Sequence, residues 1–183
     1  AAGCVRAEDL NFTAPEARGL ICRALTRERC ATLQLAPRVG DNRSSQRTAF
    51  TVSIEAASGV TTGISAHDRA HTIRTAVRAD ARPQDLHQPG HVFPLQAQAG
   101  GVLVRAGHTE AAVDLARMAG REAAGVLVEI MHDDGSMARR PQLEVFAARH
   151  GLLIGTIADL IRHRLATEHT VRRVHDQAVE TAQ

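Results

Sequence analysis

Aromatic residues are scarce in this sequence: its 183 residues include four phenylalanines and no tyrosine or tryptophan. Proteins that bind single-stranded nucleic acid stack bases on exposed aromatic side chains that are interleaved with basic ones. The 22 lysine and arginine residues are instead spread along the chain, and no basic block adjoins the few aromatic residues. We therefore expect no nucleic-acid partner.

Long apolar runs are also missing. No stretch approaches the roughly 18 consecutive apolar residues that a membrane-spanning helix needs, and the first residues lack the charged-then-apolar pattern of a signal peptide. The three cysteines, Cys4, Cys22 and Cys30, are sparse and odd in number, and no CxxC pair supports a zinc site. We expect a cytoplasmic protein with reduced thiols and without a membrane segment.

The rest of the composition is that of an ordinary globular protein. Hydrophobic residues make up 44% and charged residues 23% of the sequence, and the net charge is +2. A chain of this length buries roughly 70% of the surface that its unfolded form exposes, so we expect a single core. We place the domain at residues 1–165. Residues 166–183, where the apolar pattern has faded, are interpreted as a charged helical tail or a linker.

Strand patterns alternate with helix patterns along the chain. Strands are predicted at RGLICRAL (18–25), TAFTVSIEAA (48–57), AGVLVEIM (124–131) and LLIGT (152–156). Helices are predicted to begin near Thr26, Ser65, Thr109, Pro141 and Thr156. The segment RPQDLHQPG (82–90) is predicted to be a proline-punctuated loop that delivers His91 to a site. These elements predict an α/β (α+β) domain, a three-layer sandwich with a mixed, mostly buried β-sheet flanked by helices.

The stretch from Pro89 to Gly120 has the pattern of an anion-binding site. Glycines that can adopt special backbone conformations precede a helix start at Thr109, where free N–H groups and the helix dipole favour a phosphate. Arg105 adds a bidentate guanidinium fork and Thr109 a hydroxyl group. His108 could ligate a metal, donate to the phosphate or cap the helix. The pattern predicts a phosphate site combined with a metal site.

Three further residues have a chemical and a plain interpretation. Glu129 interrupts an apolar run, where burial would raise the pKa of its carboxyl and suit it to proton transfer near neutrality; alternatively, it faces solvent at the end of an edge strand. His91 follows a Pro-Gly pair and is either a site residue or an ordinary exposed histidine. Cys22 is more often a small buried hydrophobic residue than a nucleophile, because no base adjoins it in the sequence.

Together, several motifs resemble the 3,4-dihydroxy-2-butanone 4-phosphate synthases of riboflavin biosynthesis. The motifs are TTGISAHDR (61–69), PGHVFPL (89–95), GGVLVRAGHTEAAVDLARMAG (100–120), the Glu129 strand and DDGSMAR (133–139), and the similarity runs from about Ala1 to Arg164. The resemblance implies a homodimeric lyase that uses Mg²⁺ (or Mn²⁺). Its reaction would convert D-ribulose 5-phosphate to formate and 3,4-dihydroxy-2-butanone 4-phosphate, by metal-assisted enolisation and skeletal rearrangement.

The resemblance also implies roles for individual residues. Glu129 would be an acid/base and substrate contact, His91 a catalytic residue, and Cys22 a side chain that lines the site. His108 would be a metal ligand. The substrate-phosphate loop would consist of Arg105, Ala106, Gly107, His108 and Thr109. In some members of the family a GTP cyclohydrolase II domain follows, and the charged tail could be the start of that connection.

The sequence departs from the family pattern at its beginning. In the family an acidic segment of the type DDEDRENEGD precedes the equivalent of Ala1 and supplies a second protein ligand to the metal, and this sequence has no such segment. Gly3, Arg38 and Gln96 stand where the family usually shows Glu, Met and Arg. A second function therefore stays open, an inactive or truncated homologue that acts as a sugar-phosphate-binding or dimerisation domain.

Overall fold

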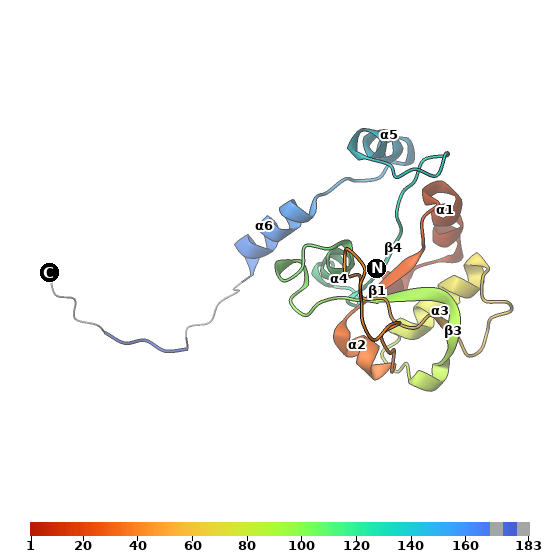
Figure 1. Ribbon diagram of the computed structural model, residues 1–183, viewed down its shortest axis with the longest axis horizontal. Helices are drawn as coiled ribbons and strands as arrows, with labels where there is room; N and C mark the ends of the chain where they lie inside the picture. Colours follow the sequence, from red (N-terminus) through yellow and green to blue (C-terminus); the bar gives the residue numbers. More distant parts are fainter. Residues whose placement is uncertain (169–173, 179–183) are drawn as a thin grey trace.

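A four-stranded sheet with the strand order β2-β3-β1-β4 forms the centre of the computed structural model, which describes residues 1–168 and 174–178 (Figure 1). The strands are β1 (Cys22–Leu25), β2 (Ile54–Ala56), β3 (Leu86–Gln96) and β4 (Ala124–Leu127). The central strands β3 and β1 run parallel, whereas β2 and β4 pair antiparallel with them at the two edges. The expected mixed sheet is therefore confirmed.

Helices cover both faces of this sheet. They are α1 (Ala7–Ala17), α2 (Arg27–Thr32), α3 (Ala66–Val77), α4 (His108–Met118), α5 (Arg140–His150) and α6 (Ile157–Thr167), with short 3-10 helices η1 (Ala2–Cys4), η2 (Pro83–Asp85) and η3 (Gly101–Leu103). Successive side chains of β1 point to opposite faces: Leu25 packs in the core with Leu10 of α1 and Ile73 of α3, and Ala24 packs with Val113 of α4. The predicted three-layer sandwich is confirmed, and α5 and α6 lie outside it (Figure 1).

The helix starts follow from local capping. The hydroxyl oxygens of Thr26, Ser65 and Thr156 each accept a hydrogen bond from the backbone N–H three residues later, at 3.0 to 3.1 Å. The carboxylate of Asp68 does not return the bond to Ser65 but accepts from the hydroxyl of Thr61 (2.8 Å) and from Gly63 N (3.1 Å). The predicted starts are confirmed, and Asp68 ties the TTG turn to α3.

The strand predicted at 48–57 is shorter than expected. Only β2 is regular, while Phe50 and Thr51 form isolated bridges. The facing strand contains Pro94, whose nitrogen carries no hydrogen. Thr51 N donates to the Pro94 carbonyl (3.0 Å), but Pro94 cannot donate in return, so the ladder is interrupted at this point.

The prediction of a loop at 82–90 is wrong from Leu86 onward, because β3 begins at that residue. His91 therefore lies within a strand rather than at the end of a loop. Pro89 is tolerated because β1 pairs only with Phe93–Gln96 of β3, and the pairing with β2 is broken by a register shift. A proline is compatible with a strand where no ladder partner needs its N–H.

The buried strand predicted at LLIGT (152–156) is also wrong. This segment forms no strand, and its side chains are exposed, that of Leu153 completely. Among residues 1–168 and 174–178 no strand pairs with it, and Leu152 N instead donates to the Ala147 carbonyl (2.8 Å) at the end of α5. Apolar composition favours a strand only where a neighbouring strand can pair with it.

The last described helix, α6, ends at Thr167, and residues 174–178 have no regular structure. The predicted tail at 166–183 thus begins in the last turn of α6, and its parts at 169–173 and 179–183 lie outside the described residues. None of the helices in the described part of the chain combines the length and the apolarity needed to cross a membrane.

The central strand β1 carries a buried arginine. Arg23 lies on β1 with 0% of its surface exposed, and none of its guanidinium nitrogens has a hydrogen-bond partner within the described residues. Burial, and secondarily the nearby Arg29, lower its pKa to about 9, so the group is still a cation at pH 7. A buried, unpaired cation costs more free energy than an apolar side chain of similar length.

Arg23→Met is therefore expected to stabilise the protein, raising the free energy of unfolding in urea by about 1–4 kcal/mol. The matched control, Arg121→Met, removes an exposed arginine and should change the same quantity by less than about 0.5 kcal/mol. An Arg23→Met protein no more stable than the wild type would mean that the guanidinium is solvated or paired after all.

Candidate functional site

The candidate site is centred on the start of α4 at His108. Gly107 is the N-cap and has no side-chain cap bond, and the first bond of the helix runs from Ala111 N to the Gly107 carbonyl (2.9 Å). The backbone N–H groups of His108, Thr109 and Glu110 therefore lack an intrahelical acceptor. They carry the positive end of the helix dipole, which makes this a suitable place for a phosphate.

The loop ahead of α4 is held by Glu110, which is 1% exposed. Its Oε1 accepts from Gln98 N (2.9 Å), and its Oε2 accepts from Arg105 Nη1 (2.6 Å). A Cβ on Gly107 would overlap both Arg105 Nη1 and Glu110 Oε2. The φ angle of Gly107 is −113°, which any residue can adopt. A side chain at position 107 would therefore displace the Arg105–Glu110 ion pair, and the position does not need the unusual backbone conformation that the sequence suggested.

Arg105 does not offer a free guanidinium fork to the site. Its Nη1 binds Glu110, and its Nη2 donates to the backbone carbonyl of Gln46 (2.8 Å). Only Nε has no partner among the described residues. Arg105 therefore ties a second loop, around Gln46, to the start of α4, and the bidentate contact that the sequence predicted is used inside the protein. For a phosphate it provides positive charge and the N–H groups that these two bonds leave over, that of Nε among them.

A cleft of 740 Å³ opens at the start of α4. Its lining comes from three parts of the chain that are distant in sequence: residues 45–48, residues 104–109 with Gln98, and the sheet residues Leu95 and Leu127 together with Glu129. The structure thus brings the predicted phosphate loop and Glu129 to one cavity.

Glu129 lies two residues beyond the end of the edge strand β4 and is exposed. The prediction that Glu129 is buried within an apolar run is wrong. The alternative, that it faces solvent at the end of an edge strand, is confirmed. Its Oε2 accepts from Leu20 N (3.0 Å), and Gly19 approaches so closely that a Cβ there would overlap the Glu129 backbone. The carboxylate is therefore anchored at the cleft wall while still open to water.

Cys22 is buried on β1, directly opposite Leu127 of β4. Leu127 lines the cleft and Cys22 does not. Burial, and secondarily the charge of Glu129, raise the pKa of the Cys22 thiol to about 12. The thiol stays protonated near neutrality, which favours the interpretation of Cys22 as a small buried side chain next to Leu127 over that of a nucleophile.

His91 is not among the residues that line this cleft. On β3 its Nδ1 lies 2.9 Å from Oε1 of Glu55, a residue of the neighbouring strand β2. Glu55 was not predicted as the partner of His91. The available signal was its place on the polar face of the alternating segment 48–57, next to a strand that could carry a histidine.

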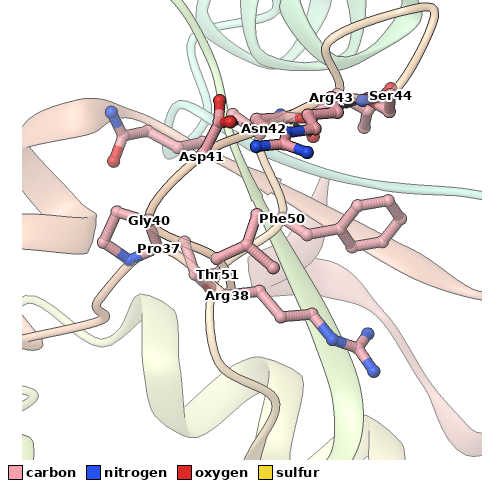
Figure 2. Close-up of a pocket in the computed structure, with 13 residues that line it drawn as sticks. Pro37, Arg38, Gly40, Asp41, Asn42, Arg43, Ser44, Phe50 and Thr51 are labelled. Carbon is pink, nitrogen blue, oxygen red and sulfur yellow. Dashed lines mark hydrogen bonds and ion pairs between the residues drawn. The ribbon is translucent and has the colours of Figure 1, made fainter.

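A second cavity, of 560 Å³, lies beside the loop at 37–44, and Thr48 lines both cavities. Figure 2 shows Asp41, Asn42, Arg43 and Ser44 on one side of it, and Pro37, Arg38 and Thr51 on the other. Arg43 Nε donates to Asp41 (2.6 Å), and the Arg38 guanidinium lies over the ring of Phe93, 5.9 Å from its centre. None of the lining residues of this cavity begins a helix, whereas the cleft at α4 combines a helix start with the carboxylate of Glu129 and is therefore the better candidate.

The donor set for a metal ion is small. In the described part of the chain no group of three or more His, Cys, Asp or Glu side chains could hold a metal. His108 and Glu129 nevertheless line the same cleft. Magnesium usually keeps several water molecules and binds one or two carboxylates together with substrate oxygens. The residues present fit a cation that is shared with a substrate rather than enclosed by the protein.

Comparisons with known sequences identify close relatives. A family model described as 3,4-dihydroxy-2-butanone 4-phosphate synthase matches residues 1–163. A Pseudomonas aeruginosa protein of that name is 61% identical over 181 residues, which cover 99% of this chain and 50% of that protein. An Aquifex aeolicus protein named riboflavin biosynthesis protein RibBA is 57% identical over 176 residues, covering 95% of this chain and 43% of that protein. The chain spans about half the length of these curated relatives.

Solved structures agree with the fold. A two-domain 3,4-dihydroxy-2-butanone 4-phosphate synthase from A. baumannii has a TM-score of 0.93 and 55% identity, and the alignment covers 99% of this chain and 53% of that one. A 3,4-dihydroxy-2-butanone 4-phosphate synthase in complex with two magnesium ions has a TM-score of 0.87 and 43% identity, covering 93% of this chain and 85% of that one.

Proposed function

The chain belongs to the 3,4-dihydroxy-2-butanone 4-phosphate synthase family, and we propose that it acts in riboflavin biosynthesis as a lyase on D-ribulose 5-phosphate. The products are formate and 3,4-dihydroxy-2-butanone 4-phosphate. The observation that carries this proposal is the single cleft that joins the open N-terminus of α4 to the anchored carboxylate of Glu129. A sugar phosphate needs both, an anion site for its phosphate and an acid/base near its carbon chain.

The phosphate half of the site consists of the loop Arg105, Ala106, Gly107, His108 and Thr109. The backbone N–H groups at the start of α4 donate to the phosphate oxygens, and the Thr109 hydroxyl and Arg105 Nε lie on the same loop. Because Glu110 holds Arg105, its charge is fixed close to the phosphate without a bidentate contact. The phosphate positions the sugar with its carbon chain along the cleft.

The chemical half of the site is Glu129. Enolisation of a ketose requires a base that removes a proton from a carbon beside the carbonyl. Glu129 is exposed to the cleft, and Leu20 N holds one of its oxygens, which leaves the other free to take that proton. Cys22 supports the cleft wall by pairing with Leu127 of the neighbouring strand. His91 does not line the cleft of its own chain. Its proposed catalytic role therefore requires that, in the proposed homodimer, the His91 of one copy reaches the cleft of the other.

A divalent cation belongs to the proposal, magnesium first and manganese as the alternative, with His108 as the protein ligand. When bound, the ion would polarise sugar oxygens and so acidify the neighbouring C–H bonds. The alternative function, a sugar-phosphate-binding or dimerisation domain without activity, has less support because the cleft keeps an anchored carboxylate beside the phosphate loop.

The remaining parts of the proposal concern the whole protein. We propose residues 1–165 as the catalytic domain and a cytoplasmic location without a nucleic-acid or membrane partner. A GTP cyclohydrolase II domain after the tail stays a prediction, which the greater length of the relatives supports.

Glu129→Gln is expected to lower formate release from ribulose 5-phosphate by about 100-fold or more, because a general base contributes roughly that factor. The amide oxygen of Gln can still accept from Leu20 N, so the fold and the binding of substrate should persist. The matched control, Glu122→Gln, changes an exposed glutamate that pairs with Arg29 and should keep full turnover. Undiminished formate release by Glu129→Gln would exclude this residue as the base.

His108→Ala separates the two halves of the site. The N–H groups of the helix start belong to the backbone, so the dissociation constant for inorganic phosphate, measured by calorimetry, should change by less than about threefold. The strengthening of ribulose 5-phosphate binding by Mg²⁺ should disappear. His67→Ala, an exposed histidine of α3, should retain it. Persistence of the Mg²⁺ effect in His108→Ala would contradict the assignment of His108 as the ligand.

A further inference from the structure

A single buried arginine connects α6 to the loop ahead of α4. Arg164 is 4% exposed, although the next residue, Leu165, is 57% exposed. Its Nη1 donates to Asp114 Oδ2 (2.7 Å) and to the carbonyl of Gly100 (2.8 Å). Its Nε and Nη2 donate to the two carboxylate oxygens of Glu168, at 2.7 and 2.6 Å. Four of the five N–H groups of the guanidinium are thus used, on one side by the loop and α4 and on the other by the end of α6.

Asp114 holds the backbone of that loop. It lies one helical turn after Glu110 and is 1% exposed. Besides Arg164, its Oδ2 accepts from Val102 N (2.8 Å). Gly101 has a φ of +64°, and a Cβ there would overlap the Asp114 carboxylate. The loop backbone is therefore wrapped directly against this buried carboxylate.

The position of the loop depends on how the charge of Asp114 is matched. A buried carboxylate without its partner is strongly destabilising. Without Arg164, the charged side chain left beside Asp114 among the described residues would be Arg117, whose side chain is 51% exposed, and the Gly100 carbonyl would lose its donor. The same loop runs on through Arg105 and Gly107 into the N–H groups of α4, so a shift at Gly100 is transmitted to the phosphate site.

We propose that Arg164 is a positioning residue for the phosphate-binding loop. From α6 it fixes the loop backbone at Gly100, directly and through Asp114, and thereby sets the affinity of the site for the phosphate of its substrate. The identity of that substrate rests on the proposed function, whereas the holding of the loop does not. α6 is accordingly a working part of the site although it lies outside the sandwich (Figure 1).

The test compares Arg164→Met with Arg162→Met in the full chain. Arg162 is on the same helix, is exposed, and is paired with the likewise exposed Asp159. Three quantities are measured: hydrogen exchange of the Val102 amide, the dissociation constant for inorganic phosphate, and KM and kcat for ribulose 5-phosphate. For Arg164→Met we expect exchange at Val102, the dissociation constant and KM each to rise about tenfold, with kcat within about twofold, because the loss concerns binding of a remote group.

Arg164→Lys should recover part of each change, since its ammonium group can still reach either Asp114 Oδ2 or the Gly100 carbonyl. Arg162→Met should match the wild type. If the wild-type chain does not turn over ribulose 5-phosphate, the proposed function is wrong. The role of Arg164 is then still decided by the hydrogen exchange of the Val102 amide and by the dissociation constant for phosphate. Unchanged Val102 exchange and phosphate affinity in Arg164→Met would overturn the proposal, as would a fall in kcat with KM unchanged. If Arg164→Met does not fold, Arg164→Lys decides by the same readouts.

Discussion

Two carboxylates buried one turn apart on α4 hold the candidate site in shape. Glu110 fixes the loop at Gln98 and Arg105. Asp114 fixes it at Val102 and is itself paired with Arg164 of α6. Removing two carboxylates from water is costly, and the cost is offset only because each accepts hydrogen bonds from backbone N–H and guanidinium groups. Because the loop is held in this way, the N–H groups at the start of α4 remain available at the cleft.

The two halves of the site differ in how much of them one chain supplies. The phosphate half is built from a continuous segment of the chain that α4, α6 and the loop around Gln46 hold from three sides. The chemical half has one carboxylate, Glu129, placed after an edge strand and anchored to Leu20. His91 and its partner Glu55 lie elsewhere. In the proposed function, one chain therefore supplies the phosphate half of the site, whereas the role proposed for His91 depends on the proposed second copy.

The sequence predicted what is local and misjudged what depends on partners. The helix starts at Thr26, Ser65 and Thr156 were predictable because a hydroxyl caps an N–H three residues away. The segment 152–156 looked like a buried strand, but a strand needs a neighbour that no local pattern reveals. At 82–90 the prolines suggested a loop, because a proline cannot donate a hydrogen bond to a neighbouring strand. The sequence could not show that neither neighbouring strand pairs with β3 at Pro89.

The site was predicted in the same uneven way. The phosphate loop followed from glycines before a helix start, which is again a local pattern. Glu110 and Asp114 were missed because polar residues in an amphipathic helix usually face solvent, and only the folding back of the loop at Gly100 buries them. Glu129 was expected to be buried because its neighbours are apolar. Its exposure follows from the end of β4, which the run of apolar residues did not mark.

The most direct test of this account is a titration of the ¹⁵N-labelled chain with inorganic phosphate, followed by the amide NMR signals. We expect the amides of His108, Thr109 and Glu110 to show the largest shifts and to saturate with one dissociation constant. Largest shifts in the cavity beside Arg38 and Arg43, with the start of α4 unmoved, would contradict it.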